Sequence, residues 1–230
     1  MMRASLYHRL QGWGLFTYAR IIGRTARYRT RGQANVTRAR ATGRPIIWTA
    51  WHGMTMLLIP YLLRHVVPEQ TTLIVPDDHR GEPLATWARL VGAHAVPISM
   101  GINSLVSGRR LVALIRAVRG GMDCYVNPDG PDGPTHVPKP GVAFIARKGQ
   151  ACLLPMGAFA SPKYTIPRWD RYSVPLPFAR IAVVVGEPIS VAPQADLNAI
   201  CERLAAALNR AEAEAEALCR SRALQRCDAP

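Results

Sequence analysis

The fold is decided by residues 45–63, PIIWTAWHGMTMLLIPYLL, in which an apolar run passes directly into a helical pattern. The bulky residues of Ile46–Trp51 predict a short buried strand, and Met54–Leu63 predicts a helix that follows it. The run between Arg44 and Arg64 lacks Lys, Arg, Asp and Glu, a feature that also fits a transmembrane span. Because the run contains two prolines, a glycine and a histidine, we favour the strand and helix over a span.

Apolar runs and helical patterns alternate along the rest of the chain. Strands are expected at Ile46–Trp51, Thr72–Val75, Ala93–Ile98, Cys124–Val126, Cys152–Met156 and Ile181–Val185, and helices at Met54–Leu63, Pro83–Val91, Leu105–Val118, Val142–Lys148 and Ala195–Leu224. Such alternation predicts an α/β fold with a central mixed, largely parallel sheet flanked by helices. We therefore expect a single α/β domain at residues 33–230, preceded by an N-terminal arm at residues 1–32.

The chain is strongly basic, since 29 Lys and Arg outnumber 15 Asp and Glu and give a formal net charge of +14. A field of this sign favours anionic partners, namely phospholipid headgroups, nucleic acid or an acidic carrier protein. The five cysteines form no C-x-x-C pair and their count is odd, so we expect neither a disulfide framework nor a zinc site. The sequence also lacks the glycine-rich motifs of dinucleotide and P-loop sites.

The N-terminal arm is a basic, amphipathic segment. Its apolar residues are Leu6, Leu10, Trp13, Phe16, Tyr18, Ile21 and Ile22, and the basic residues among them are Arg3, Arg9, Arg20, Arg24 and Arg27. This pattern suits a helix that lies in the interface of an anionic membrane. The alternative is a helix packed on the domain with its arginines in water, and we favour the membrane interpretation.

Polar residues that could carry chemistry follow three of the expected strands. His52 lies between a strand and a helix, where its near-neutral pKa suits a general base and the following amides could hold an oxyanion. Residues 127–134, NPDGPDGP, form a stiff loop with two carboxylates and with backbone amides that a ligand can approach closely. Residues 77–82, DDHRGE, place acids, a histidine and an arginine at the same predicted edge of the sheet.

Several short motifs occur in a characteristic order along the chain. They are Trp51-His52-Gly53, Gly81-Glu82, Pro128-Asp129-Gly130-Pro131-Asp132-Gly133-Pro134, Lys139-Pro140-Gly141-Val142, Trp169-Asp170-Arg171-Tyr172, Val174-Pro175-Leu176-Pro177-Phe178 and Gly186-Glu187-Pro188-Ile189. Together they resemble the lysophospholipid acyltransferase superfamily, in a bacterial branch long treated as a domain of unknown function. The resemblance covers about Ile46 to Ile189.

The resemblance implies an acyltransferase that moves a fatty acyl chain from a thioester, acyl-CoA or an acyl carrier protein, to a hydroxyl of a lysophospholipid or glycolipid. It makes His52 the base and the loop around Asp129 and Gly130 the acceptor-binding element. Substrate-binding residues are expected at Gly53, Ser99, Asp129, Gly130, Pro131, Asp132, Gly133 and Lys139. It also implies the cytoplasmic face of the bacterial inner membrane, a peripheral or monotopic attachment, anionic lipids and an acyl carrier protein as partners, and no metal, cofactor or nucleic acid.

The sequence departs from the family pattern in the acids. The superfamily usually places an aspartate a few residues after the histidine, whereas Met54–Leu57 contains no carboxylate. Arg80 replaces an acid of the branch, and Pro97-Ile98-Ser99 stands where the branch tends to carry Arg-Gly-Ser. The acid that orients His52 is therefore left open among Asp78, Glu82 and Asp129, with Asp78 and Glu82 taken as catalytic candidates beside His52.

Three other functions compete with this interpretation. The missing acids also fit a non-catalytic, membrane-associated lipid-binding relative. The charge fits a nucleic-acid-binding protein, although no recognisable motif accompanies it. A hydrolase that uses His52 and Asp129 would differ from the transferase only in taking water as the acceptor.

Overall fold

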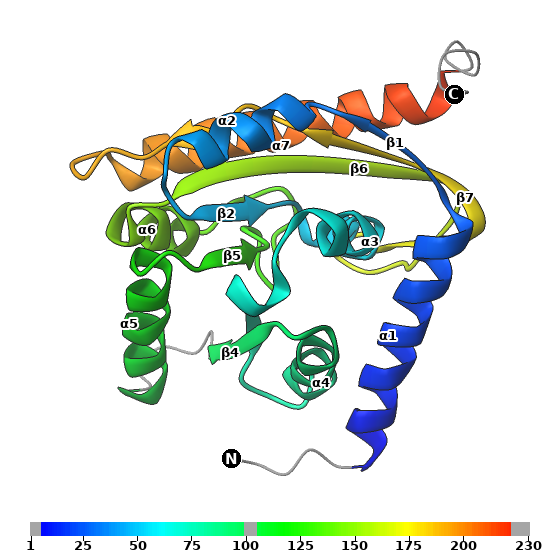
Figure 1. Ribbon diagram of the computed structural model, residues 1–230, viewed down its shortest axis with the longest axis horizontal. Helices are drawn as coiled ribbons and strands as arrows, with labels where there is room; N and C mark the ends of the chain where they lie inside the picture. Colours follow the sequence, from blue (N-terminus) through cyan, green and yellow to red (C-terminus); the bar gives the residue numbers. More distant parts are fainter. Residues whose placement is uncertain (1–5, 99–104, 222–230) are drawn as a thin grey trace.

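The computed structural model describes residues 6–98 and 105–221, which form one α/β domain (Figure 1). The strands are β1 (Arg27–Arg31), β2 (Ile46–Thr49), β3 (Thr71–Pro76), β4 (His94–Ile98), β5 (Asp123–Val126), β6 (Cys152–Thr165), β7 (Ser173–Val185) and β8 (Ile189–Ser190). The α-helices are α1 (Leu6–Thr25), α2 (Gln33–Ala41), α3 (Thr55–His65), α4 (Gly81–Val91), α5 (Leu105–Arg119), α6 (Pro140–Gly149) and α7 (Leu197–Arg220), and the short 3-10 helices are η1 (His52–Met54) and η2 (Pro68–Gln70).

The strands form one mixed sheet in the order β1-β7-β6-β2-β5-β3-β4, with β8 on β6. The pairs β1–β7, β2–β6, β2–β5, β3–β5 and β3–β4 are parallel, whereas β6 pairs antiparallel with β7 and β8. The predicted α/β fold with a largely parallel sheet is therefore confirmed. Parallel strands that follow this order carry their carboxyl ends to one edge, where α/β proteins place their sites.

The core lies around β2, whose four residues are all fully buried. Helices cover both faces of the sheet, as a parallel sheet requires, and α7 runs along β6 and β7 (Figure 1). The apolar run between Arg44 and Arg64 forms β2, η1 and α3 within this core. Among the described residues, no helix is long and apolar enough to cross a membrane.

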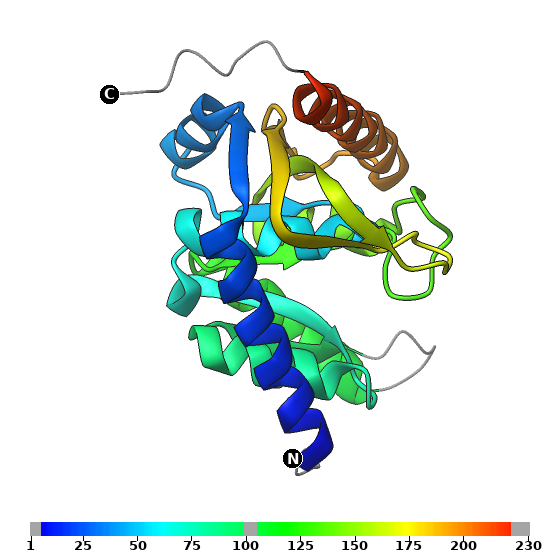
Figure 2. The same cartoon turned by 90° about the vertical axis from the view of Figure 1, so that its right-hand side faces the viewer.

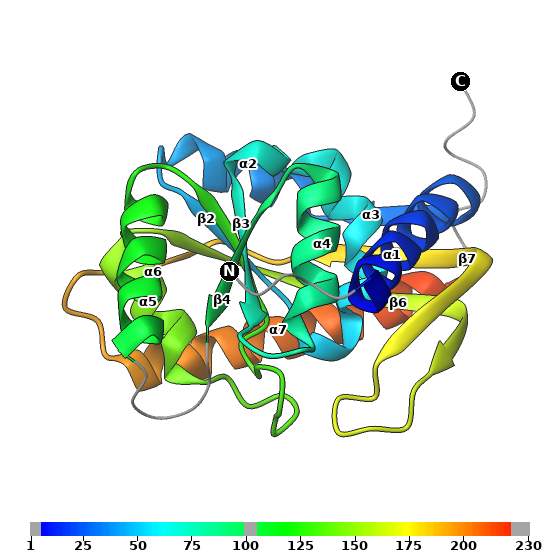
Figure 3. The same cartoon turned by 90° about the horizontal axis from the view of Figure 1, so that it is seen from below.

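The predicted strands at Cys152–Met156 and Ile181–Val185 are parts of a much longer hairpin. β6 and β7 extend to Thr165 and Ser173, so the connecting turn, residues 166–172, lies well beyond the ends of the predicted strands. In Figure 3 this turn and the loop after β5 emerge at the same edge of the molecule. The hairpin therefore brings a distant part of the chain to the carboxyl ends of the parallel strands.

The predicted arm, residues 1–32, contains α1 and the edge strand β1. β1 was not expected from its sequence, RYRTR, but it pairs with β7 and so belongs to the sheet of the domain. Charged side chains are common on edge strands, where they discourage pairing with other molecules. α1 packs against the domain through Gly12, Ala19 and Ile22.

Candidate active site

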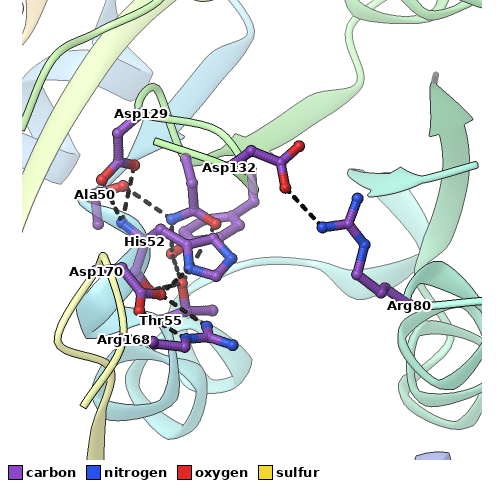
Figure 4. Close-up of polar contacts among 10 residues, drawn as sticks. Ala50, His52, Thr55, Arg80, Asp129, Asp132, Arg168 and Asp170 are labelled. Carbon is purple, nitrogen blue, oxygen red and sulfur yellow. Dashed lines mark hydrogen bonds and ion pairs between the residues drawn. The ribbon is translucent and has the colours of Figure 1, made fainter. Parts of the chain in front are cut away.

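His52 is placed by the junction of β2, η1 and α3, directly beyond the carboxyl end of the central strand. Its ring points toward the turn between β6 and β7 and lies beside the loop that follows β5 (Figure 4). Trp169 and Tyr172 of that turn flank the imidazole, with ring centroids 5.5 and 5.6 Å away. The ring is thus enclosed by aromatic groups yet keeps 23% of its side-chain surface exposed.

The carboxylate that contacts the imidazole is Asp170, from the turn between β6 and β7. Asp170 Oδ2 lies 2.6 Å from His52 Nδ1, and the Asp170 side chain is fully buried. Arg168 donates two hydrogen bonds of 2.7 Å, from Nε to Oδ1 and from Nη2 to Oδ2 of the same carboxylate. Such a bidentate pair fixes the plane of the carboxylate, and the carboxylate in turn fixes the imidazole.

The charges of this pair favour a neutral histidine beside an ionised aspartate. Burial raises the pKa of Asp170, but the hydrogen bonds from Arg168 and His52 outweigh it, so the pKa lies below its ordinary value. Burial lowers the pKa of His52, which Asp170 only partly offsets. An ionised Asp170 accepts a hydrogen bond from the N–H at Nδ1, which leaves Nε2 as the basic nitrogen. Among the described residues, Nε2 has no hydrogen-bond partner.

Asp129, in the loop after β5, holds the backbone of His52 instead of its ring. The amide of His52 donates to Asp129 Oδ1 at 3.0 Å and to Oδ2 at 3.3 Å, and the Asp129 side chain is buried. Burial raises the pKa of Asp129 to about 6, against the opposing effect of these backbone hydrogen bonds. The loop and the histidine are therefore locked together by one carboxylate.

Two glycines of the loop adopt left-handed backbone conformations that favour glycine. Gly130 has φ 66° and Gly133 has φ 71°. A Cβ on Gly130 would lie 2.9 Å from Lys139 Nζ, and one on Gly133 would lie 2.7 Å from the ring of Trp169. The loop is therefore seated against the β6–β7 turn, and Lys139 extends over Gly130. Lys139 forms no ion pair with any other described residue.

A network of hydroxyl and amide groups connects the strand and the helix on either side of His52. Asn127 Nδ2 donates to the carbonyl of Ala50 at 2.9 Å and contacts the Tyr125 hydroxyl at 3.1 Å. Thr55 Oγ1 lies 2.9 Å from the carbonyl oxygen of His52 and 3.3 Å from Asn127 Oδ1. These contacts tie the end of β5 to the start of α3, on either side of the histidine (Figure 4).

The acids proposed from sequence to orient His52 lie elsewhere. Asp78 pairs with Arg80, which also donates to Asp132 Oδ1 at 2.7 Å across the edge of the site (Figure 4). Glu82 lies 2.6 Å from the ring of His8 on α1. The expected set of Asp78, Glu82 and Asp129 is therefore corrected, because in the structure the partner of the imidazole is Asp170.

The predicted substrate-binding residues are largely brought together. Gly53, Asp129, Gly130, Pro131, Asp132, Gly133 and Lys139 all belong to His52's own turn or to the facing loop. Ser99 lies outside the described residues. Asp170 was not selected from sequence, although it stands within Trp169-Asp170-Arg171-Tyr172, one of the motifs that carry the resemblance. Arg168 and Arg171 lie close to Asp170 in the sequence, and an aspartate is almost never fully buried unless it is paired.

No group of three or more His, Cys, Asp and Glu side chains is arranged to hold a metal ion in the described part of the chain. What the site does offer is a buried carboxylate, an imidazole with one free nitrogen, and a rigid loop beside it. That arrangement suits removal of a proton from a hydroxyl or water held next to Nε2.

Comparison with known proteins gives a relative and a structural match. No protein-family model matches the chain. An uncharacterized protein of Rickettsia prowazekii is 25% identical over 146 residues, and the match covers 64% of this chain and 64% of that protein, less than two thirds of its length. The crystal structure of the 1-acyl-sn-glycerophosphate acyltransferase PlsC from Thermotoga maritima superposes with a TM-score of 0.59 at 16% identity, over 94% of this chain and 85% of that one. The chain therefore shares the fold of that acyltransferase, in agreement with the fold that the resemblance of its motifs implies.

Proposed function

We propose that this protein is an acyltransferase that moves a fatty acyl group from an acyl thioester to a hydroxyl of a lysophospholipid or glycolipid. The observation that carries the proposal is the 2.6 Å contact between His52 Nδ1 and Asp170 Oδ2, because it leaves Nε2 as a base at the carboxyl edge of the sheet. The fold shared with PlsC supports the same class of reaction. The pair also argues against a non-catalytic relative, since a protein kept only for its shape has no need of an oriented imidazole.

In the proposed reaction, His52 Nε2 accepts the proton of the acceptor hydroxyl as the oxygen attacks the thioester carbonyl. The new C–O bond forms, the C–S bond breaks, and the proton passes from the imidazolium to the departing thiolate. The products are an ester and a free thiol, so no external oxidant, reductant or metal is needed. Asp170 stays ionised and stabilises the transient imidazolium, and Arg168 holds Asp170 in place.

The loop after β5 is the proposed acceptor site. The side chain of Asp129 accepts a hydrogen bond from the backbone amide of His52 and so holds the histidine beside the loop. The ammonium group of Lys139 lies over Gly130. A cation there suits either the developing oxyanion or an anionic headgroup. The orienting role given to Asp78 and Glu82 from sequence passes to Asp170.

We further propose that the protein works on the cytoplasmic face of a bacterial inner membrane. On α1, Leu6, Leu10 and Trp13 are more than half exposed although they are apolar. They share the outer face of the helix with arginines, and no acid occurs in α1. This combination supports binding to anionic lipid, and the net charge of +14 would serve equally for an acyl carrier protein or the phosphates of coenzyme A.

The proposal is tested with purified protein, radiolabelled acyl-CoA or acyl carrier protein thioesters, and a bacterial lipid extract. Thin-layer chromatography should reveal a labelled lipid whose formation depends on a thioester donor. Vesicle binding without any labelled product across this panel would support the lipid-binding alternative. Release of free fatty acid as the sole product would support the hydrolase.

A further inference from the structure

The long hairpin carries an irregular, apolar bulge on β7. Ser161 is paired with Arg180 and Lys163 with Pro175, so residues 176–179 of β7 face a single residue of β6. The bulge contains three consecutive exposed residues, Leu176, Pro177 and Phe178. A regular strand would turn alternate residues inward, so the bulge keeps apolar side chains outside the domain.

Phe178 combines two unfavourable features, an exposed apolar side chain and a strained backbone. Its side chain is 74% exposed, and its backbone has φ 64°, in the left-handed region that bulky residues rarely adopt. Leu176 is also exposed, at 41%. No contact among the described residues requires an aromatic side chain here, and glycine would fit this backbone better. Strained, exposed apolar residues of this kind typically mark a contact surface.

The bulge begins next to a residue that contacts α1. The hydroxyl of Tyr18 donates to the carbonyl of Pro175, the residue directly before the bulge. Figure 2 shows α1 and β7 next to each other on the side of the molecule that faces the viewer, and the two elements are in contact. α1 and the strand that carries the bulge therefore lie on the same side of the protein.

The charges of the hairpin match an anionic surface. Residues 161–180 contain Lys163, Arg168, Arg171 and Arg180 but a single acid, Asp170, which gives 4 − 1 = +3. Asp170 is buried and paired, so the charges that the hairpin presents to solvent are basic. α1 adds Arg9, Arg20 and Arg24 without an acid. Exposed apolar residues on elements that also carry arginines suit the interface of an anionic bilayer.

We propose that the Leu176–Phe178 bulge inserts into the interface of an anionic phospholipid bilayer as a second contact beside α1. The inference rests on the membrane placement in the proposed function and extends it to the element that carries Asp170. Because the same hairpin presents the bulge to lipid and Asp170 to His52, docking would set the catalytic pair at a fixed position relative to the membrane surface. A lipid acceptor could then reach the site without leaving the bilayer.

Vesicle sedimentation tests this proposal without any need for catalysis. The vesicles are phosphatidylcholine with roughly a quarter phosphatidylglycerol, which gives a negative surface. The double variant Leu176→Ser/Phe178→Gly should partition about tenfold more weakly than wild type, since it loses two interfacial side chains. Phe178→Trp should bind like wild type because it retains an apolar aromatic side chain. Val112→Ala, which trims an exposed apolar residue on α5, should also leave binding unchanged.

Thermal unfolding separates this effect from misfolding. Phe178→Gly should melt at the same temperature as wild type or higher, because glycine relieves the left-handed backbone at that position. Unchanged vesicle binding by a folded double variant would overturn the inference, as would an equal loss in Val112→Ala. Absence of transferase activity would count against the proposed function alone, because partitioning is measured on the protein whether or not it turns over.

Discussion

Gly53 and Asp170 are in direct backbone contact. The carbonyl oxygen of Asp170 occupies the space that a Cβ on Gly53 would need, so the β6–β7 turn rests on the residue immediately after the histidine. This contact places the carboxylate of Asp170 at the imidazole, although His52 and Asp170 are 118 positions apart in the sequence. A glycine is required at position 53 because the backbone of the β6–β7 turn packs directly against it.

Gly53→Ala should therefore separate Asp170 from His52. The added methyl group must push the turn away, and overpacking of this kind costs about 1–3 kcal/mol of unfolding free energy. We expect lower stability in urea unfolding and a large loss of acyl transfer. Gly108→Ala on α5 is the control, because no atom lies within 4 Å of the position that its added methyl group would take and alanine favours a helix. Equal behaviour of the two variants would contradict the seating role of Gly53.

Asp170→Asn should lower the rate of acyl transfer on the order of 10²–10⁴-fold, while the fold is kept. The amide can donate to Nδ1 and so favour the tautomer in which Nε2 carries the proton and cannot act as base. Asp196→Asn is the matched control, since Asp196 caps α7 by accepting a hydrogen bond from the amide of Ala199, a role that asparagine also fills. Steady-state rates for the two variants decide the point, and comparable losses would argue against orientation by Asp170.

The pH dependence of transfer should follow the depressed pKa of His52. Burial lowers this pKa below the ordinary value of 6.5, so His52 is the free base at neutral pH and the acidic limb of kcat/KM should fall below pH 6.5. The hydrogen bond and charge of Asp170 raise the same pKa. Any residual activity of Asp170→Asn should therefore show its acidic limb at lower pH. An acidic limb that moves to higher pH in Asp170→Asn would contradict the role of Asp170 as the partner of His52.

Asp129 should make the fold less stable as the pH rises from about 4 to about 6. Burial raises the pKa of Asp129 in the folded state to about 6, from an ordinary value of 3.8, so the folded state binds this proton more tightly than the unfolded state does. The resulting stabilisation is lost as the pH rises and the proton dissociates. Asp129→Asn can still accept the hydrogen bond from the amide of His52 through its side-chain oxygen. Relative to wild type, the unfolding free energy of the variant should increase by up to about 3 kcal/mol between pH 4 and pH 7. Urea unfolding at both pH values measures this difference, and a gap that stays constant would refute it.

The exposed face of α1 should govern part of the binding to anionic vesicles. Leu10→Ser/Trp13→Ser removes two side chains that are more than half exposed, so the stability of the fold should change little. Partitioning into vesicles should fall, and added salt should weaken the binding of wild type by screening its arginines. Binding that is equal for wild type and variant would place α1 outside the membrane contact.

The sequence predicted the parallel part of the fold because buried strands appear as continuous apolar runs between helical patterns. β2, β3, β4 and β5 were expected within a few residues of their observed bounds. β1 was missed because its alternating arginines resemble a loop, and it becomes a strand only through pairing with β7. The closing helix was expected at Ala195–Leu224 and is observed at Leu197–Arg220, with residues 222–224 outside the described part.

The site was predictable wherever its residues follow strands of the parallel sheet. His52 and the loop at residues 127–134 were found in this way, and the structure brings them together through Asp129. Asp170 was missed because it depends on the length and direction of a hairpin, which local patterns do not specify. Glu82 stands beside the predicted edge of the sheet, but its side chain contacts His8 on α1 instead of His52.

The most direct test of the proposed mechanism is the rate of ester formation by His52→Ala, measured with the thioester donor and the acceptor lipid identified for wild type. His94→Ala serves as control, because His94 lies on the edge strand β4 and contacts the carbonyl of Glu69. We predict a loss on the order of 10²–10⁴-fold or more for His52→Ala and wild-type rates for His94→Ala. Full transfer activity in folded His52→Ala would contradict the mechanism.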